Sequence, residues 1–380
     1  MFSFFSPQAI HFGRGQSQKT AVLAATFGTS VLLVHGANVG RAQWLIDACH
    51  AAGLTIERVS CANEPSLPDI ERALRQLNGV LPDIVIGLGG GSVLDFAKAL
   101  AALIPCKGDP KTYFEVVGDG RPLDHAPLPM IALPTTAGTG AEVTKNAVIL
   151  VPDQSIKVSL RDPRMVPNVA IVDPSLMQGA PKQVALAAGL DAVTQVIEPY
   201  LSIKANPMTD ALCHEAISNG LSALRDLVEY DTPEAWDGMA WVSTCGGLAL
   251  ANAGLGAIHG FAGVIGGETN APHGEICGAL LPAVLESHLR KAEEHTEVSV
   301  RLHWVLHQID TYFAKGEKGM GITALRSWSR RMGLPGLEGL GLSLADYSKV
   351  AEAASKASSM SGNPFVLSQN ELMEILLSAK

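Results

Sequence analysis

The chain has 380 residues, of which 47% are hydrophobic and 17% charged, and 28 Lys and Arg against 37 Asp and Glu give a net charge of −9. This apolar content is enough for a large core, so it excludes a disordered chain and a disulfide-dependent miniprotein. The acidic balance, with no basic run longer than a pair such as Arg330-Arg331, argues against nucleic acid or an anionic membrane surface as the partner.

The cysteines and the N-terminus bear on location. The six cysteines are scattered through apolar segments without a CxxC pair, a pattern typical of buried free thiols in a reducing compartment. The segment Met1–Phe5 lacks the positive leader and long apolar core of a secretory signal. No apolar run approaches the roughly 18–20 residues that a spanning helix requires. We therefore expect a cytoplasmic protein without a membrane segment.

The first half of the chain alternates short β-branched runs with helical patterns. The first predicted strands are Val31–Val34, Ile56–Val59 and Ile84–Leu88, and the helices after them are Arg41–Ala52, Asp69–Leu77 and Val93–Leu103. After a Pro- and Gly-rich loop over 106–128, strands are predicted at Met130–Leu133, Ala147–Val151, Lys157–Leu160 and Ala170–Val172. Alternation of this kind predicts a parallel sheet with helices on both faces.

The composition and periodicity of the sequence change near residue 180, where Ala and Leu begin to dominate and strand patterns vanish. Helical spacing then continues almost to the C-terminus. We therefore predict an α/β domain over residues 1–178 and an all-helical domain over residues 179–380.

Three glycines, Gly89–Gly91, lie between the third predicted strand and the helix after it. They let a ligand approach the backbone, and the start of the helix offers N–H groups and a positive dipole end to an anion. Ser92 and Asp95 have the spacing of a capping box. The turn lacks the GxGxxG spacing and follows the third strand instead of the first. A tight turn before a capped helix therefore remains the alternative to a phosphate site.

A second run of small and hydroxylated residues, Pro134–Glu142, follows the strand predicted at 130–133. Its hydroxyls and N–H groups suit a phosphate or a ribose, although a plain polar loop would look the same. Both runs follow predicted parallel strands, so they would lie at the carboxyl edge of the sheet, where open α/β sheets bind ligands. Together they predict a nucleotide site.

Candidate metal ligands lie in the helical half. Asp191 and Gln195 are four residues apart and share a helix face, with Glu198 near the same face. His259 and His273 flank a glycine-rich segment, 263–270, that we expect to fold back. One carboxylate and two imidazoles suit Fe²⁺ or Zn²⁺ and leave positions open for water and substrate. No HExxH signature is present, so ordinary packing of these side chains remains the alternative.

Four motifs together resemble the iron-containing (group III) alcohol dehydrogenase family. Gly89–Lys98 and Thr135–Thr144 are similar to its two cofactor motifs, and Gly189–Ala192 and Pro272–Gly274 to its metal-site motifs, in order along nearly the whole chain. The resemblance implies a dehydroquinate synthase-like architecture, in which a dinucleotide-binding α/β domain precedes a helical domain for metal and substrate. It also implies NAD or NADP, a divalent metal (Fe²⁺ or Zn²⁺) and a homodimer.

The resemblance also implies which residues bind. The cofactor would be bound by Gly89, Gly90, Gly91, Ser92, Asp95, Thr135, Thr136, Thr139, Thr144 and Lys157. The metal would be bound by Asp191, Gln195, His259 and His273. No catalytic side chain beyond these is identified.

The chain departs from the family pattern at three positions. Gln195 stands where the family usually has a fourth ligand, His, and an amide is the poorer ligand, although related glycerol dehydrogenases use an Asp/His/His set. Gly263 stands where many members have a His linked to proton transfer. Gly36 stands where many have an Asp that selects NAD. Loss of that carboxylate, with Arg41 nearby in sequence, would admit the 2′-phosphate of NADP.

The implied reaction is metal-assisted hydride transfer between a nicotinamide and a small alcohol, aldehyde or ketone. Two alternatives stay open. One is a metal-independent enzyme resembling maleylacetate reductase, which would reduce an unsaturated keto acid. The other is a nucleotide-binding homologue without turnover. The lack of His at positions 195 and 263 favours this homologue, whereas the joint presence of Asp191, His259 and His273 opposes it.

Overall fold

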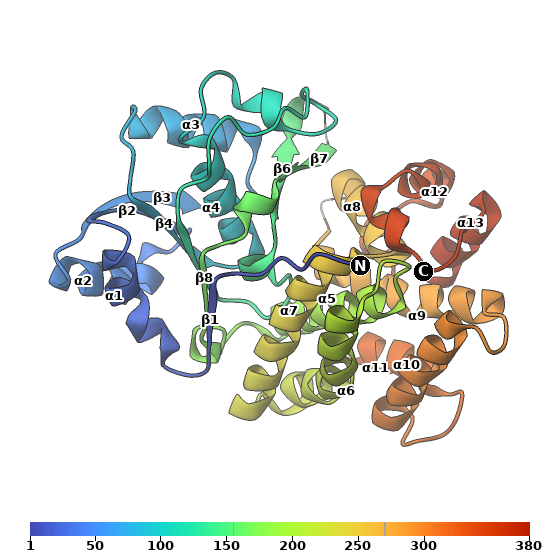
Figure 1. Cartoon of the computed structure of the whole chain (residues 1–380). Coiled ribbons are helices and arrows are strands. Elements are labelled where there is room, and N and C mark those ends of the chain that lie inside the picture. Colours follow the sequence, from blue (N-terminus) through green and yellow to red (C-terminus); the bar gives the residue numbers. More distant parts are fainter. Residues whose placement is uncertain (155, 270) are drawn as a thin grey trace. The chain divides into compact units, whose positions relative to one another are not determined.

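The computed structural model describes residues 1–154, 156–269 and 271–380, and the chain folds into two compact units (Figure 1). The α/β unit comprises Phe5–Thr136 and Gly140–Gln178. The helical unit comprises Met1–Phe4, Ala137–Thr139 and Gly179–Lys380. The short excursion of Ala137–Thr139 into the helical unit lies inside one of the loops singled out in the sequence.

The α/β unit contains a six-stranded parallel sheet in the order β1-β8-β5-β4-β2-β3. Its strands are β1 (Ala9–Phe12), β2 (Ser30–Gly36), β3 (Thr55–Cys61), β4 (Ile84–Gly89), β5 (Met130–Pro134) and β8 (Val169–Val172). An antiparallel hairpin is formed by β6 (Asn146–Val151) and β7 (Ile156–Arg161). The predicted parallel sheet is confirmed, but β1 was missed because it is four residues long and none of them is fully buried.

Helices cover both faces of this sheet, as Figure 1 shows. They are α1 (Thr20–Ala25), α2 (Gln43–Ala51), α3 (Leu67–Leu77) and α4 (Gly91–Leu103). Successive side chains of a strand point to opposite faces. Val31 and Leu33 of β2 therefore pack with α1 and α2, whereas Leu32 and Val34 pack with α3 and α4. Burial on both faces explains why β4, β5 and β8 and most of β2 appear as continuous apolar runs.

Helix α4 lies unusually close to β4. A Cβ atom on Gly89 would stand 2.5 Å from the Cβ atom of Val93, and one on Gly87 would stand 3.0 Å from that of Ala97. Close packing alone therefore requires glycine at these strand positions.

The predicted capping box of Ser92 and Asp95 is wrong. The helix begins at Gly91, with Gly90 as its N-cap and no side chain bonded to the cap. Ser92 therefore already lies inside the first turn. The Asp95 carboxylate instead accepts a hydrogen bond from the Val148 N–H and pairs with Lys98.

The helical unit is built around α5. Its helices are α5 (Lys182–Leu201), α6 (Pro207–Tyr230), α7 (Pro233–Ala253), α8 (Ala257–Thr269), α9 (His273–Lys291), α10 (Glu297–Phe313), α11 (Gly321–Arg331), α12 (Tyr347–Ser355) and α13 (Gln369–Ser378). Helix α5 contacts α6, α7 and α9 and is buried almost all round from Ala185 onward. Such a helix carries small and apolar residues on every side.

The expected fold-back over 263–270 is wrong, because α8 runs without a break to Thr269; Asn270 lies outside the described residues. Burial of Ile258, Phe261 and Ile265 against the rest of the unit outweighs the low helix propensity of its glycines.

Within the described residues, no single helix has the length and apolar composition needed to cross a membrane. Helices α7 and α8 meet these criteria only when taken together, across a bend of 100°.

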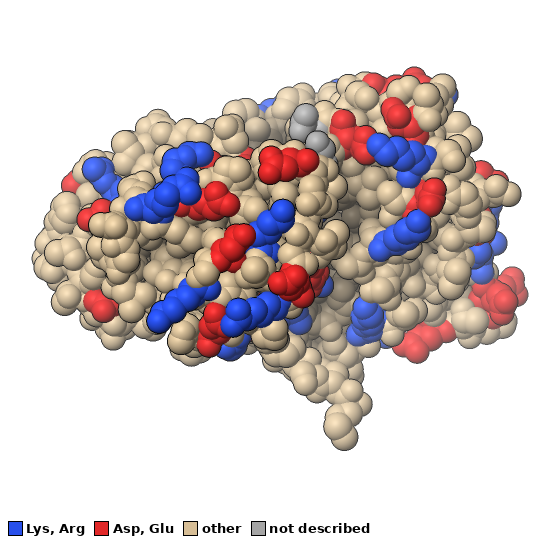
Figure 2. Space-filling view, turned by 90° about the horizontal axis from the view of Figure 1, so that it is seen from above, with Lys and Arg blue, Asp and Glu red and all other residues tan. Residues whose placement is uncertain are grey.

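Acidic and basic side chains are interspersed on the face of the molecule drawn in Figure 2. The ion pairs of the described residues include local ones, such as Arg72 with Asp69 and Lys356 with Glu352. This mixture is consistent with the weak clustering of Lys and Arg in the sequence.

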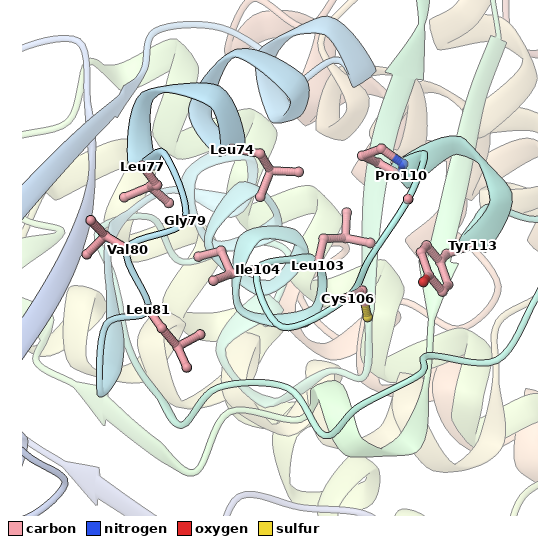
Figure 3. A pocket seen from close by; sticks show the side chains of 11 residues that line it. Leu74, Leu77, Gly79, Val80, Leu81, Leu103, Ile104, Cys106, Pro110 and Tyr113 are labelled. Carbon is pink, nitrogen blue, oxygen red and sulfur yellow. The ribbon is translucent and has the colours of Figure 1, made fainter.

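A surface recess of about 240 Å³ lies in the α/β unit between α3 and the end of α4 (Figure 3). Its walls are mainly aliphatic and include Leu74, Leu77 and Leu103. The hydroxyl of Tyr113 at its edge donates hydrogen bonds toward Lys107 and Asp124. The recess therefore offers apolar surface and few groups for chemistry.

Candidate functional site

Three helices of the helical unit bring together Asp191 (α5), His259 (α8) and His273 (α9). Asp191 Oδ1 lies 3.3 Å from Nε2 of His259 and 3.7 Å from Nε2 of His273. The ring centroids of the two histidines are 5.3 Å apart. Asp191 and His259 are buried, whereas the His273 side chain is 40% exposed. The cluster is therefore sealed on its inner side and open at His273.

Close packing of α9 on α5 places His273 beside Asp191. A Cβ atom on Gly274 would lie 2.1 Å from the Ala187 carbonyl oxygen. One turn later, a Cβ atom on Gly278 would lie 2.5 Å from Leu190 Cδ1. These glycines let α9 approach α5 closely enough for His273 to lie beside Asp191.

Glu198 fixes the orientation of the His259 ring. Its Oε2 lies 2.6 Å from Nδ1 of His259, and its Oε1 accepts a hydrogen bond from the Ile258 N–H at 2.7 Å. An imidazole held through Nδ1 by a carboxylate presents Nε2 to a metal in the tautomer that can bind it. The sequence placed Glu198 near the face of Asp191 but did not identify this role.

The electrostatics of the cluster favour a cation. Burial would raise the pKa of Asp191, but the neighbouring His273 and His259 hold it below its usual value. Burial likewise opposes protonation of both imidazoles, yet Cys277 and Asp191 raise their pKa values above the ordinary one. Asp191 Oδ1 is also buried, and no described residue offers it a hydrogen bond. A divalent cation would satisfy this oxygen and both Nε2 atoms, so the residues fit a metal.

Cys277 is a fourth member of the cluster. It follows His273 by one helical turn and therefore lies on the same face of α9. Its Sγ lies 3.9 Å from Nε2 of His259, and one ligand atom from each of the four residues lies within 4.8 Å of the others. All six cysteines are free. Grouping them as packing thiols concealed this one, although the His-x3-Cys spacing was the available signal.

Gln195 is buried on α5, one turn after Asp191. Its Nε2 donates a hydrogen bond to the carbonyl oxygen of Gly138 at 2.7 Å. Gly138 belongs to the loop segment that packs on α5, where its Cβ position lies 3.1 Å from Ala188. The amide thus has a structural role, and coordination by Gln195 stays a prediction. Gly263 lies on an exposed part of α8 with open space around its Cβ position.

The two predicted cofactor loops lie side by side, as the sheet edge argument predicted. Gly89 and Pro134 are register partners at the carboxyl ends of the neighbouring strands β4 and β5. The Thr135 N–H donates to the Gly89 carbonyl at 3.0 Å, and Thr136 lies close to Gly90. With no side chain at its cap, the start of α4, which includes Ser92, presents backbone N–H groups suited to a phosphate.

Three other residues assigned to the cofactor by resemblance, Asp95, Thr144 and Lys157, contact side chains of the α/β unit. Lys98 is buried, pairs with Asp95 at 3.0 Å and donates to Thr144 Oγ1 at 2.8 Å. Lys157 pairs with Glu64 at 2.6 Å. Thr139 lies in the segment grouped with the helical unit. Asp95 and Thr144 therefore help to fasten α4 to β6, and their contacts with a cofactor remain predictions.

The family is decided by comparison with known proteins. Residues 7–174 match the family model of the iron-containing alcohol dehydrogenases, and residues 185–380 match that of the C-terminal part of the Fe-containing alcohol dehydrogenase family. The chain belongs to the iron-containing alcohol dehydrogenase family. Membership confirms three predictions from the sequence. These are the family, the fold class and the assignment of the protein to the oxidoreductases.

Individual family members match over the full length. Alcohol dehydrogenase 4 of Saccharomyces cerevisiae (strain YJM789) is 30% identical over 99% of this chain and 98% of its own. The NAD-dependent methanol dehydrogenase of Bacillus methanolicus is 29% identical over 100% of both chains. The structure of an alcohol dehydrogenase from Oenococcus oeni is 27% identical, covers 100% of both chains and has a TM-score of 0.88.

Proposed function

We propose that this protein transfers a hydride reversibly between a nicotinamide cofactor and a small alcohol, aldehyde or ketone, with a divalent metal held by Asp191, His259 and His273. Family membership supports the reaction class. The observation that carries the metal is the buried Asp191 Oδ1, which has no hydrogen-bond partner among the described residues and lies 3.3 and 3.7 Å from two imidazole nitrogens. When bound, the metal supplies Lewis acidity toward the substrate oxygen, and the cofactor accepts or donates the hydride.

The chain's own residues prepare this chemistry. Glu198 accepts a hydrogen bond from the Nδ1–H of His259, and this tautomer leaves Nε2 free to bind the cation. Burial of Asp191 and His259 excludes water from the inner side, whereas the exposed edge of His273 leaves room for a substrate. The first turn of α4 and the neighbouring Thr135 and Thr136 would bind the pyrophosphate through N–H and O–H donors.

The finer assignments are part of the proposal. A methanol dehydrogenase relative is named NAD-dependent. The chain has Gly36 at the end of β2, with no carboxylate to repel a 2′-phosphate, so we include NADP as a cofactor. Zn²⁺ beside Fe²⁺, a homodimer and a cytoplasmic location complete the proposal.

The test combines metal analysis with turnover. Protein purified without chelator should contain Fe or Zn and reduce a panel of aldehydes with NADH or NADPH. His273→Ala should lose the metal and most of the activity. His307→Ala, which alters an exposed residue of α10, should keep both.

Other outcomes would contradict the proposal in distinct ways. Reduction of an unsaturated keto acid that is indifferent to Fe²⁺, Zn²⁺ and chelator would support the metal-independent reductase. Tight NADPH binding without turnover on any carbonyl would support the homologue without activity.

A further inference from the structure

We infer that the thiolate of Cys277 is the fourth protein ligand of the metal, in place of the imidazole that position 195 lacks. The inference rests on the metal site of the proposed function. It changes the ligand set from one carboxylate and imidazoles alone to one carboxylate, two imidazoles and one sulfur.

The spacing of the ligand atoms matches a single coordination shell. Bond lengths of about 2.0–2.3 Å place the corners of a tetrahedron roughly 3.3–3.8 Å apart. Asp191 Oδ1 lies 3.3 Å from Nε2 of His259 and 3.7 Å from Nε2 of His273. Cys277 Sγ lies 3.9 Å from Nε2 of His259. Only small side-chain adjustments would therefore close the shell around an ion.

Charge also favours sulfur over the amide of Gln195. A Cys277 thiolate places a second negative charge directly on the divalent cation beside Asp191, whereas the amide oxygen of Gln195 is neutral and would leave the second charge to Glu198, which lies behind His259. The Nε2 of Gln195 already donates a hydrogen bond to the carbonyl oxygen of Gly138. This bond is sufficient to explain why an amide is buried at position 195. Thiolate is also a softer ligand than imidazole, which shifts preference from Fe²⁺ toward Zn²⁺.

Burial alone does not explain Cys277. Cys213 is buried to the same degree, and burial raises the pKa of its thiol well above the usual value. Among the described residues, the group with metal-ligand spacing contains Cys277 and not Cys213. Cys213 is therefore a matched control. A fourth protein ligand does not exclude a substrate, because zinc sites can expand to five ligands during catalysis.

The test is spectroscopic and uses the full chain loaded with Co²⁺. The wild type should show an intense near-ultraviolet sulfur-to-cobalt charge-transfer band. Cys277→Ser should lose that band while keeping the weaker visible cobalt bands, and its Zn²⁺ affinity should fall at least about tenfold. Cys213→Ser and Gln195→Ala should both keep the charge-transfer band.

A second measurement needs no variant. X-ray absorption at the zinc edge of the wild type should show a sulfur neighbour at about 2.3 Å. A shell of nitrogen and oxygen alone, or a charge-transfer band that persists in Cys277→Ser, would overturn the inference. If such a protein still binds metal and reduces aldehydes, the proposed function stands and only the role of Cys277 falls. If the wild type binds no metal, both fall.

Discussion

At the scale of single residues, Glu198 has the most specific role that the sequence did not reveal. Its two oxygens contact His259 Nδ1 at 2.6 Å and the Ile258 N–H at 2.7 Å. Glu198→Gln removes the negative charge that fixes the imidazole, so Zn²⁺ affinity should fall about 10–100-fold while the fold persists. Competition with a chelator measures this. Glu352→Gln, in an exposed ion pair of α12, is the control. Unchanged affinity in Glu198→Gln would show that the carboxylate does not support the metal.

Gly36 tests the cofactor preference. No atom of the described residues lies within 4 Å of its Cβ position, so Gly36→Asp should fold normally. A carboxylate there would repel a 2′-phosphate, and we expect the kcat/KM for NADPH to fall about tenfold relative to that for NADH. Steady-state kinetics with both cofactors give the ratio. A wild type that never uses NADPH, or a ratio that does not move, would rule out this role for position 36.

Sequence reasoning reached some of these residues and not others. Asp191, His259 and His273 could be predicted because each is a metal-binding residue type within or beside a short, recognisable sequence motif. Glu198 and Cys277 gain their roles only from the packing of α5, α8 and α9, because Glu198 meets His259 from 61 residues away. The sequence gives no signal for the role of Glu198, and the spacing of Cys277 from His273 was its only signal for Cys277.

At the scale of elements, the approach of α9 to α5 decides whether a metal site exists. Gly274→Ala would place a methyl group 2.1 Å from a backbone oxygen of Ala187, which cannot move as a side chain can. Overpacking of this kind costs about 1–3 kcal/mol of unfolding free energy. The shift of α9 should also lower metal affinity sharply, as measured by chelator competition.

Gly263→Ala provides the control for this substitution. It lies in α8 with open space around its Cβ position, so it should leave metal binding unchanged and be neutral or slightly stabilising. If Gly274→Ala bound metal as the wild type does, close packing at that position would not be needed for the site.

The elements themselves were predicted best where burial is complete. Buried strands such as β4 and β5 differ from their predicted bounds by one residue, because their apolar runs end at glycine or proline. The capping box failed because Gly90, and not a polar residue, precedes α4. The second half of α8 was wrongly expected to fold back because its glycines suggest a turn, and only tertiary packing keeps them helical.

At the scale of the whole molecule, the change of composition near residue 180 corresponds to the division of the chain into the α/β unit and the helical unit. The departure of Ala137–Thr139 from the α/β unit was beyond sequence reasoning. It depends on the contact of Gly138 with Ala188 and on its hydrogen bond from Gln195, neither of which a local pattern encodes. The hydrogen bond from Gln195 to Gly138 also satisfies the buried amide, so Gln195 need not bind a metal to be stable at this position.

The pH dependence of stability should report on a buried histidine of the helical unit. His288 on α9 is 2% exposed, and Phe365 packs against its ring. Burial lowers the pKa of His288 to about 4 from its ordinary value of 6.5, although Glu198 and the side chain of Asn363 oppose this shift and Lys291 assists it. The unfolded chain therefore binds a proton that the folded chain does not between these two values.

The sign follows from this difference. The contribution of neutral His288 to stability is complete above pH 6.5 and is lost as the pH falls toward 4. At pH 5 the loss should be about 2 kcal/mol of unfolding free energy. His288→Leu should reduce the difference between urea unfolding at pH 7 and pH 5 by about that amount, whereas the exposed His307→Leu should leave it unchanged. An equal pH dependence in His288→Leu and the wild type would mean that His288 is protonated or solvated in the folded protein.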